Sequence, residues 1–240
     1  MRFDVGRHNF YRVKFFCWGK MAASKDCIKR YTTIAATLDI LKRKKLPLLN
    51  PERWDDQNDR YFMELYKRKK EIGGLYALCT ASCSMTYHHW RVFTNAADGA
   101  CIEIKREDLE VRLKKIVKNT DFKISYDNMK YMTIKEIKKN QKNNIDSLPF
   151  IKRHGFNPES EYRIIAEVPD NQKDTYLIDF PIGLISRIYI NPWLPKSIFR
   201  SIKQLINKIP GCRGLRITHS RLTDNQTWKK FGDKIVQKLN

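Results

Sequence analysis

Short apolar runs of strand length alternate with segments of helical period along this sequence, and this alternation limits the folds that the chain can adopt. Strands are predicted from the apolar runs 75–82, 99–104, 162–168, 176–180, 185–190 and 215–217. Helices are predicted where apolar residues recur every three or four positions, at 34–46, 56–70, 87–93 and 196–208. Helices dominate the first half and strands interleave in the second. The expected class is therefore α+β, with a mixed or antiparallel sheet flanked by helices.

The 240 residues are expected to form one domain, whose core spans about 30–217. The lysine- and asparagine-rich segment 112–147 has few apolar residues and is predicted to be a basic helical insertion, with its best helix at 131–142. A basic helix and strand are predicted within 196–240. Because no apolar run is long enough to span a bilayer and residues 1–20 lack a signal-peptide core, we expect a cytoplasmic protein with no membrane partner.

Basic side chains are concentrated in three segments of the chain. The formal net charge is +21, and segments 7–45, 112–142 and 196–240 carry +9, +7 and +9, so the remainder is mildly acidic. A field of this size concentrates polyanions near the protein and steers them toward it. RNA or DNA is therefore the first partner to consider, and solvated lysine faces are the alternative interpretation.

Three carboxylates are gathered at Asp55, Asp56 and Asp59, where the second predicted helix begins. A carboxylate at this position caps the free amides of the first turn and complements the helix dipole. The alternative is a divalent-metal site, because magnesium prefers a few carboxylate oxygens together with retained waters. Both interpretations stay open at this point.

A second cluster follows the strand predicted at 75–82. Ser82 ends that strand, where a small residue lets a ligand approach the backbone closely. His89 is a candidate acid, base or phosphate contact, and adjacent histidines on a helix point about 100° apart, so His88 and His89 do not serve one metal together. Trp90 is either a core residue or a surface on which a ligand stacks.

The third cluster combines Glu159, Glu161 and Arg163 with the upstream cations Lys152 and His154. If the strand begins at Glu159, residues 159, 161 and 163 share one face. Two carboxylates and a guanidinium are costly to bury unless they are paired, so this face is either a solvated edge or a functional site. If this face is a functional site, Lys152, His154 and Arg163 are candidate phosphate contacts. His89 of the second cluster is another.

Taken together, these motifs resemble the bacterial family known as domain of unknown function 2971. The resemblance covers about 30–217, and it departs from the family pattern at Phe93, where a tyrosine is usual, and at Pro158, where an aromatic residue is usual. The matching residues are Arg30-Tyr31-Thr32-Thr33, Trp54-Asp55-Asp56 with Asn58-Asp59, segments 78–82, 90–93 and 99–104, and Lys152 with Phe156 and 159–163.

The order of these motifs is similar to the three-part signature of ADP-ribosyltransferases, and that resemblance implies an ADP-ribosyltransferase-like fold with NAD as the bound molecule. It implies that Glu161 hydrogen-bonds the nicotinamide ribose and that Glu159 activates the acceptor. A fixed carboxylate suits this reaction because positive charge develops on the ribose in the transition state. The NAD contacts implied are Arg30, Tyr31, Ser82 and Trp90.

Three functions stay open from the sequence. The first is an ADP-ribosyltransferase-like effector or toxin, in anti-phage defence, that acts on nucleic acid held by the basic surface and is restrained by a regulatory or antitoxin partner. The second is a nuclease that uses Asp55, Asp56, Asp59 or Glu161 with magnesium, or His89 and His154 without metal. The third is a nucleic-acid-binding or regulatory module without catalysis.

Overall fold

The structure is a computed structural model that describes residues 27–94, 98–118, 120, 122–139, 144–169 and 174–237. The part of the basic segment 7–45 that precedes residue 27 lies outside these residues. Within the described ranges, no helix is both long enough and apolar enough to cross a membrane.

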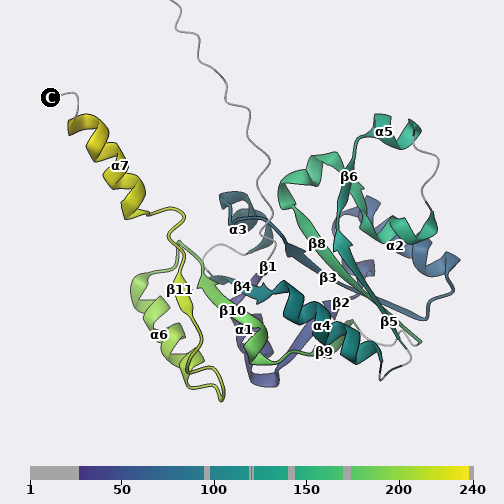
Figure 1. The fold of residues 1–240 in the computed structure, drawn as a ribbon, viewed down its shortest axis with the longest axis horizontal. Coiled ribbons are helices and arrows are strands. Elements are labelled where there is room, and N and C mark those ends of the chain that lie inside the picture. Colours follow the sequence, from purple (N-terminus) through teal and green to yellow (C-terminus); the bar gives the residue numbers. More distant parts are fainter. Residues whose placement is uncertain are drawn as a thin grey trace, which may run out of the picture.

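A mixed sheet is at the centre of the molecule, which confirms the predicted α+β class (Figure 1). The strands run in the order β11-β10-β4-β1-β3-β2-β9, and β8 pairs with both β3 and β5. All neighbours are antiparallel except β10 and β11, which are parallel. The strands are β1 (Cys27–Thr33), β2 (Lys45–Leu49), β3 (Gly74–Ala81), β4 (Gly99–Lys105), β5 (Lys123–Asn128), β8 (Glu161–Val168), β9 (Thr175–Asp179), β10 (Ile185–Ile190) and β11 (Ile217–His219).

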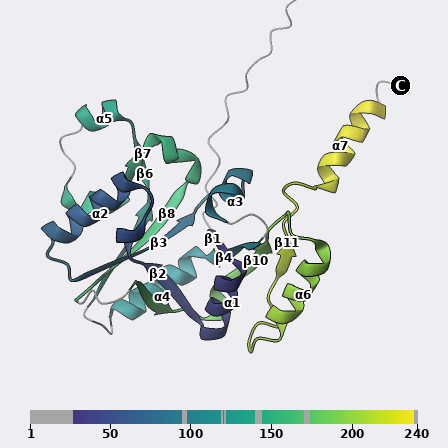
Figure 2. The same ribbon diagram turned by 180° about the vertical axis from the view of Figure 1, so that it is seen from behind.

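The helices lie around this sheet and begin where side-chain caps are available. Thr33, Asp56 and Thr86 each accept hydrogen bonds from free amides at the start of α1, α2 and α3. In both views α6 and β11 lie at one end of the molecule and α2 and α5 at the other, while α7 extends away from the body (Figure 2). The helices are α1 (Ile34–Arg43), α2 (Gln57–Lys69), α3 (Tyr87–Phe93), α4 (Arg106–Val117), α5 (Ile134–Lys139), α6 (Lys196–Asn207) and α7 (Gln226–Gln237).

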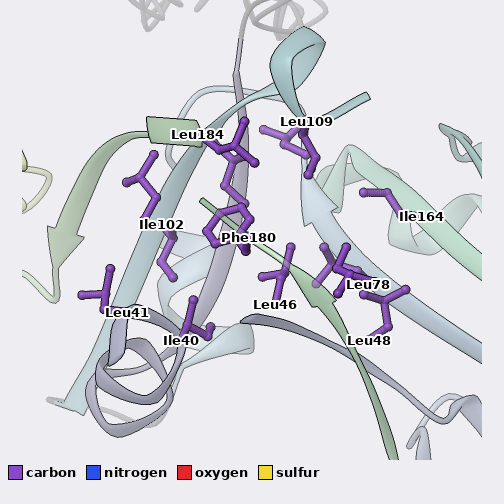
Figure 3. Close-up of a cluster of buried hydrophobic side chains, with 14 of the residues drawn as sticks. Ile40, Leu41, Leu46, Leu48, Leu78, Ile102, Leu109, Ile164, Phe180 and Leu184 are labelled. Atoms are coloured by element: carbon purple, nitrogen blue, oxygen red, sulfur yellow. The ribbon is translucent and has the colours of Figure 1, made fainter. Parts of the chain in front are cut away.

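The main hydrophobic core packs α1 and α4 against the sheet (Figure 3). Leu41 on α1, Leu109 on α4 and Ile102 on β4 are all buried in it. Each fully buried side chain of this size stabilises the fold by roughly 1.5–3 kcal/mol relative to exposure. This core anchors β1, which lines the cavity described below, and its partner strand β4.

The predicted basic insertion at 112–147 is in part a strand of the main sheet. Residues 123–128 form β5, which pairs with β8 from Lys123 opposite Glu167 to Asn128 opposite Tyr162. The segment is poor in apolar residues because β5 pairs only with β8 and leaves much of its surface to solvent. Residues 130–132 form β6, which pairs with β7 (Ile151–Arg153) in a small second sheet, so the helix predicted to begin at 131 begins at Ile134 as α5.

α1 is shorter than the helix predicted at 34–46. The helix ends earlier, at Arg43, and Lys44 adopts a left-handed conformation with φ of 53° before β2 begins. Pro47 lies inside β2, where it is tolerated because β2 pairs with β3 at one position only, Leu49 opposite Ala77.

Candidate active site

A cavity of about 570 Å³ lies where β1 and β3 separate. The two strands pair at a single position, Lys29 opposite Ala81, although β1 is fully paired with β4 and β3 with β8. The walls of the cavity include Arg30 and Tyr31 from β1, the end of α3, and the glutamates Glu159 and Glu161. The volume falls within the range of pockets that hold small molecules and cofactors.

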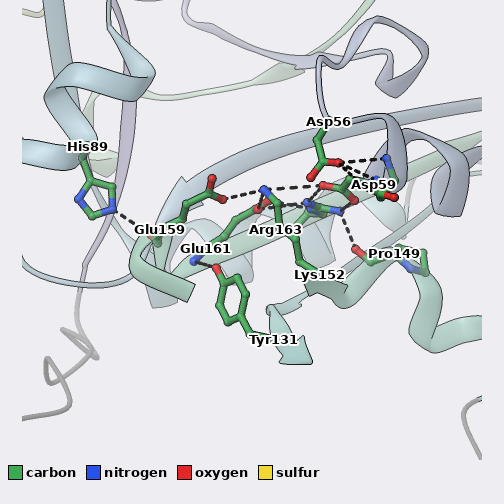
Figure 4. Close-up of polar contacts among 10 residues, drawn as sticks. Asp56, Asp59, His89, Tyr131, Pro149, Lys152, Glu159, Glu161 and Arg163 are labelled. Atoms are coloured by element: carbon green, nitrogen blue, oxygen red, sulfur yellow. Dashed lines mark hydrogen bonds and ion pairs between the residues drawn. The ribbon is translucent and has the colours of Figure 1, made fainter. Parts of the chain in front are cut away.

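A buried arginine organises the polar wall of this cavity (Figure 4). The side chain of Arg163 is completely buried, and its Nε and Nη2 donate to Glu161 at 2.7 and 3.1 Å. Nη1 and Nη2 also form a bidentate pair with Asp59 at 2.8 and 2.6 Å, and Nη1 donates to the carbonyl oxygen of Pro149 at 2.9 Å. All five N–H donors of the guanidinium are therefore satisfied within the protein. The expectation that Arg163 contacts phosphate is wrong, because this side chain is buried and fully paired.

Lys152 lies inside the same group of carboxylates. Its Nζ donates to Glu159 at 2.6 Å and to Glu161 at 3.2 Å, and it is 3.8 Å from Asp59. The ring of Phe156 lies 4.8 Å from this ammonium. Lys152 was expected to contact phosphate, but its ammonium group instead bridges the carboxylates of Glu159 and Glu161.

The two glutamates titrate differently because their neighbours differ. Burial raises the pKa of Glu161, but the charges and hydrogen bonds of Arg163 and Lys152 outweigh burial and lower that pKa to about 2. The pKa of Glu159 is raised, chiefly by burial, and the nearby carboxylates of Glu161 and Asp59 add to this. Glu161 is therefore ionised at neutral pH, whereas Glu159 is a better proton acceptor than an ordinary carboxylate.

Acid is expected to destabilise the folded protein through Glu161. Its folded pKa of about 2 lies below the ordinary value of 4.5, so its stabilising effect is complete above pH 4.5 and is lost as the pH falls toward 2. The unfolding free energy, measured by urea titration, should therefore fall less between about pH 6 and about pH 3 in Glu161→Gln than in the wild type. An equal loss in both proteins would contradict the lowered pKa.

The chain between the two glutamates turns sharply and is held by Ser82. The strand begins at Glu161, and Glu159 belongs to the preceding 3₁₀ helix His154–Glu159, so the two are not alternate residues of one strand as predicted. Ser160 between them has a left-handed φ of 45°. The backbone N and the hydroxyl of Ser82 both donate to the carbonyl oxygen of Ser160 at 2.8 Å. Ser82, expected to shape an NAD pocket, instead positions this turn.

His89 is buried behind the cavity and supports one of its walls. Its Nε2 is 3.0 Å from the carbonyl oxygen of Glu159, which accepts only, so Nε2 carries the proton. Nδ1 is 2.6 Å from the hydroxyl of Thr86, and burial lowers the pKa of the imidazole. The ring stacks on Tyr31 with a centroid distance of 5.3 Å. The expected phosphate contact at His89 is therefore wrong, because the neutral ring is buried and both nitrogens are in use.

Two further predicted residues lie away from the cavity walls. Trp90 is fully buried and packs edge-on against Tyr31 at 5.3 Å, which confirms its alternative interpretation as a core residue rather than an NAD contact. His154 is exposed and does not line the cavity. Its contact with nucleic acid stays a prediction.

Arg30 differs from Arg163 in having free donors. Its Nη1 donates to the carbonyl oxygen of Cys79 at 3.1 Å, and no other hydrogen bond or ion pair engages the guanidinium among the described residues. Arg30 lines the cavity together with Tyr31 and Phe93. Among the described residues, this arginine therefore retains donors for an anionic ligand, and its contact with NAD stays a prediction.

The carboxylates of the first cluster do not converge on a metal site. Asp56 caps α2 by accepting from the amides of Asn58 and Asp59, which confirms the capping interpretation, and Asp59 is paired with Arg163. Asp55 is exposed at the cavity. In the described part of the chain, no group of three or more histidine, cysteine, aspartate or glutamate side chains is arranged to hold a metal ion.

The pairing of Asp59 with Arg163 was not predicted from the sequence. Asp59, Met63 and Tyr66 are the buried residues of α2 and follow one another at helical spacing. A carboxylate on the buried face of a helix needs a cationic partner. The position of Asp59 on that face therefore indicated, from the sequence, that it pairs with a buried cation.

Comparison with known proteins gives one set of similar structures. No known family model matches the sequence, so membership of domain of unknown function 2971 stays a prediction, and no curated protein matches. The DarT protein of Thermus sp. 2.9 in complex with NAD+ is similar at 11% identity and a TM-score of 0.43, over 82% of this chain and 96% of that chain. The same DarT in complex with ADP-ribosylated ssDNA is similar at 10% identity and a TM-score of 0.42, over 84% and 97% of the two chains.

Proposed function

We propose that this protein transfers ADP-ribose from NAD to a nucleic acid. The observation that supports this function is the cavity itself, which brings the partly unpaired guanidinium of Arg30 together with Glu159 and Glu161. Arg30 and the two glutamates come from separate motifs, and we assign each residue a distinct role in the reaction.

Arg30 and the aromatic residues around it suit a dinucleotide. A guanidinium with free donors recognises phosphate oxygens through two parallel hydrogen bonds, so Arg30 would hold the pyrophosphate. Tyr31 and Phe93 offer apolar ring surfaces in the same cavity for the nicotinamide or adenine. His89 keeps Tyr31 in place because it stacks on the face of that ring.

Glu161 would stabilise the charge that develops when the glycosidic bond breaks. Nicotinamide leaves with the bonding electron pair, and the ribose carbon becomes positively charged before the acceptor attacks it. A carboxylate held in one orientation by Arg163 and Lys152 is already positioned for that charge and needs no rearrangement. The acceptor forms the new bond to the ribose carbon and loses a proton, which Glu159 accepts because its pKa is raised.

The net charge of +21 favours a nucleic acid as the acceptor. A transferase acting on the nucleic acid of its own cell would be toxic. The proposal therefore includes a cytoplasmic effector or toxin role in anti-phage defence, with a partner protein that restrains it.

The test is incubation of the purified protein with NAD labelled on its adenylate phosphate, in separate tubes with RNA, DNA and cell protein. We expect label to enter a nucleic acid, and we expect this to continue when a chelator removes divalent metal, since no carboxylate cluster suited to a metal is found in the described residues. Unchanged NAD together with shortened nucleic acid that requires magnesium would overturn the proposal in favour of a nuclease. Unchanged NAD together with intact, bound nucleic acid would favour a non-catalytic module.

A further inference from the structure

A second cavity, of about 790 Å³, lies between α6 and β11, outside the candidate active site. Its lining includes Lys196, Arg200 and Lys203 from α6, and Arg221 from the segment after β11. We call this cavity and its four cations the α6–β11 groove.

The four cations of this groove form no close ion pair with any of the described residues. No carboxylate lies within 4.0 Å of the charged nitrogens of these four residues in the described ranges, whereas Lys152 and Arg163 are fully engaged by carboxylates. Asp224 is the one acidic residue among the described residues that line the groove; it is paired with Lys229 at 2.7 Å and also interacts with the charge of Lys196. The groove is therefore a concave surface with a net positive charge, which favours a polyanion.

The start of α6 adds hydrogen-bond donors to the same groove. Pro195 and Lys196 line it, and α6 has neither a side-chain cap nor an acidic residue in its first turn. The free amides and the helix dipole at this end favour anions. His219 also lines the groove, and its Nε2 is buried without a hydrogen-bond partner in the structure while the ring packs on Phe199 at 5.2 Å.

Aromatic and cationic side chains lie between this groove and the first cavity. The guanidinium of Arg91 is 4.0 Å from the ring of Trp193 and 5.1 Å from that of Tyr87, and the two rings meet edge-to-face at 5.4 Å. Tyr87 is 51% exposed. We call Tyr87, Arg91 and Trp193 the stacking surface.

The stacking surface adjoins both cavities along the chain. It includes residues of α3, which ends at Phe93 in the first cavity, and Trp193, whose neighbours Pro192 and Leu194 line the α6–β11 groove. Thr94 of the first cavity and Asn191 pack closely on either side of Gly99, where a Cβ would lie 2.6 Å from Thr94 and 3.0 Å from Asn191. A chain bound in the groove would therefore cross the stacking surface to reach the glutamates.

We propose that the α6–β11 groove binds the phosphates of a single-stranded nucleic acid whose bases stack on Tyr87, Arg91 and Trp193. Exposed aromatic rings and guanidinium planes favour unpaired bases, because the bases of a duplex already stack on one another. A strand bound in this way would be delivered to Glu159 and Glu161 as the acceptor, and this step rests on the proposed function.

The test measures binding of the full chain to a fluorescent single strand of about 12 nucleotides, which spans a typical site. Arg200→Ala/Lys203→Ala should weaken binding about tenfold and reduce the salt slope by roughly 1.4, since each phosphate contact contributes about 0.7 for single strands. Lys114→Ala/Lys115→Ala on α4 makes the same charge change outside both cavities and should leave binding nearly unchanged. Equal effects of the two double variants would overturn the assignment of the groove.

A third variant tests the stacking surface. Tyr87→Ala should weaken single-strand binding about tenfold with an unchanged salt slope, because stacking on a ring neutralises no phosphate. A duplex of the same sequence that binds as tightly as the single strand would overturn the choice of an unpaired strand. Competition by inorganic phosphate or a free nucleoside triphosphate at the oligonucleotide's own concentration would also overturn it, and would indicate a small-anion site.

The same variants separate this inference from the proposed function. NAD hydrolysis without nucleic acid depends on the first cavity alone, so Arg200→Ala/Lys203→Ala should retain it while losing label transfer to the strand. If the wild type does not consume NAD but binds the strand through the groove, the proposed function fails and the groove assignment stands. If the wild type labels a strand and Arg200→Ala/Lys203→Ala labels it equally well, the groove assignment fails and the proposed function stands.

Discussion

Glu161→Gln is expected to lower the turnover number for NAD by about 10²–10³-fold, the effect typical of removing one fixed group that stabilises transition-state charge. Glutamine has nearly the same shape but lacks the negative charge that would face the ribose. The measurement is release of nicotinamide, together with transfer of label to nucleic acid.

The matched control for this variant is Glu167→Gln on the same strand. Glu167 is also partly buried and accepts a hydrogen bond from Tyr66 at 2.7 Å, but it does not line the cavity. Its replacement should leave turnover within a few-fold of the wild type. Circular dichroism and a thermal melt establish that both variants are folded. Wild-type turnover by folded Glu161→Gln would rule out the role proposed for this residue.

Arg163→Met is expected to cost about 3–5 kcal/mol of unfolding free energy, measured by urea titration. Methionine retains much of the side-chain length, but the change leaves Asp59 and Glu161 buried with Lys152 as the one ion-pair partner that remains among the described residues. A buried carboxylate without its partner loses its solvation and gains nothing in return.

An exposed arginine provides the comparison. Arg43→Met removes an ion pair with Asp39 in which both side chains are more than half exposed, and it should change stability by less than about 1 kcal/mol. The double variant Asp59→Asn/Arg163→Met should recover part of the loss, because one buried charge is removed together with its partner. Similar costs for Arg43→Met and Arg163→Met would show that the buried network contributes no more than a surface pair.

Sequence patterns predicted the elements whose signals are local. The helix predicted at 56–70 is α2, and the strand predicted at 75–82 is β3, each within one residue at either end. Helical spacing, an N-terminal aspartate cap and an unbroken apolar run are properties of neighbouring residues, so no tertiary contact was needed to find them. β5 was missed because a polar strand at an edge is specified by its partner β8 and not by its own composition.

The candidate site divides in the same way. The sequence by itself determined that Glu159, Glu161 and Arg163 need partners, because three charges so close together are stable in a folded protein only when solvated or paired. The tertiary structure alone decided which partners they have. Asp59 reaches Arg163 across 104 positions of sequence, and Ser82 holds the turn at Ser160 across 78. Such contacts depend on how β3 and β8 pair and where α2 packs, and hydrophobic burial over the whole chain sets both.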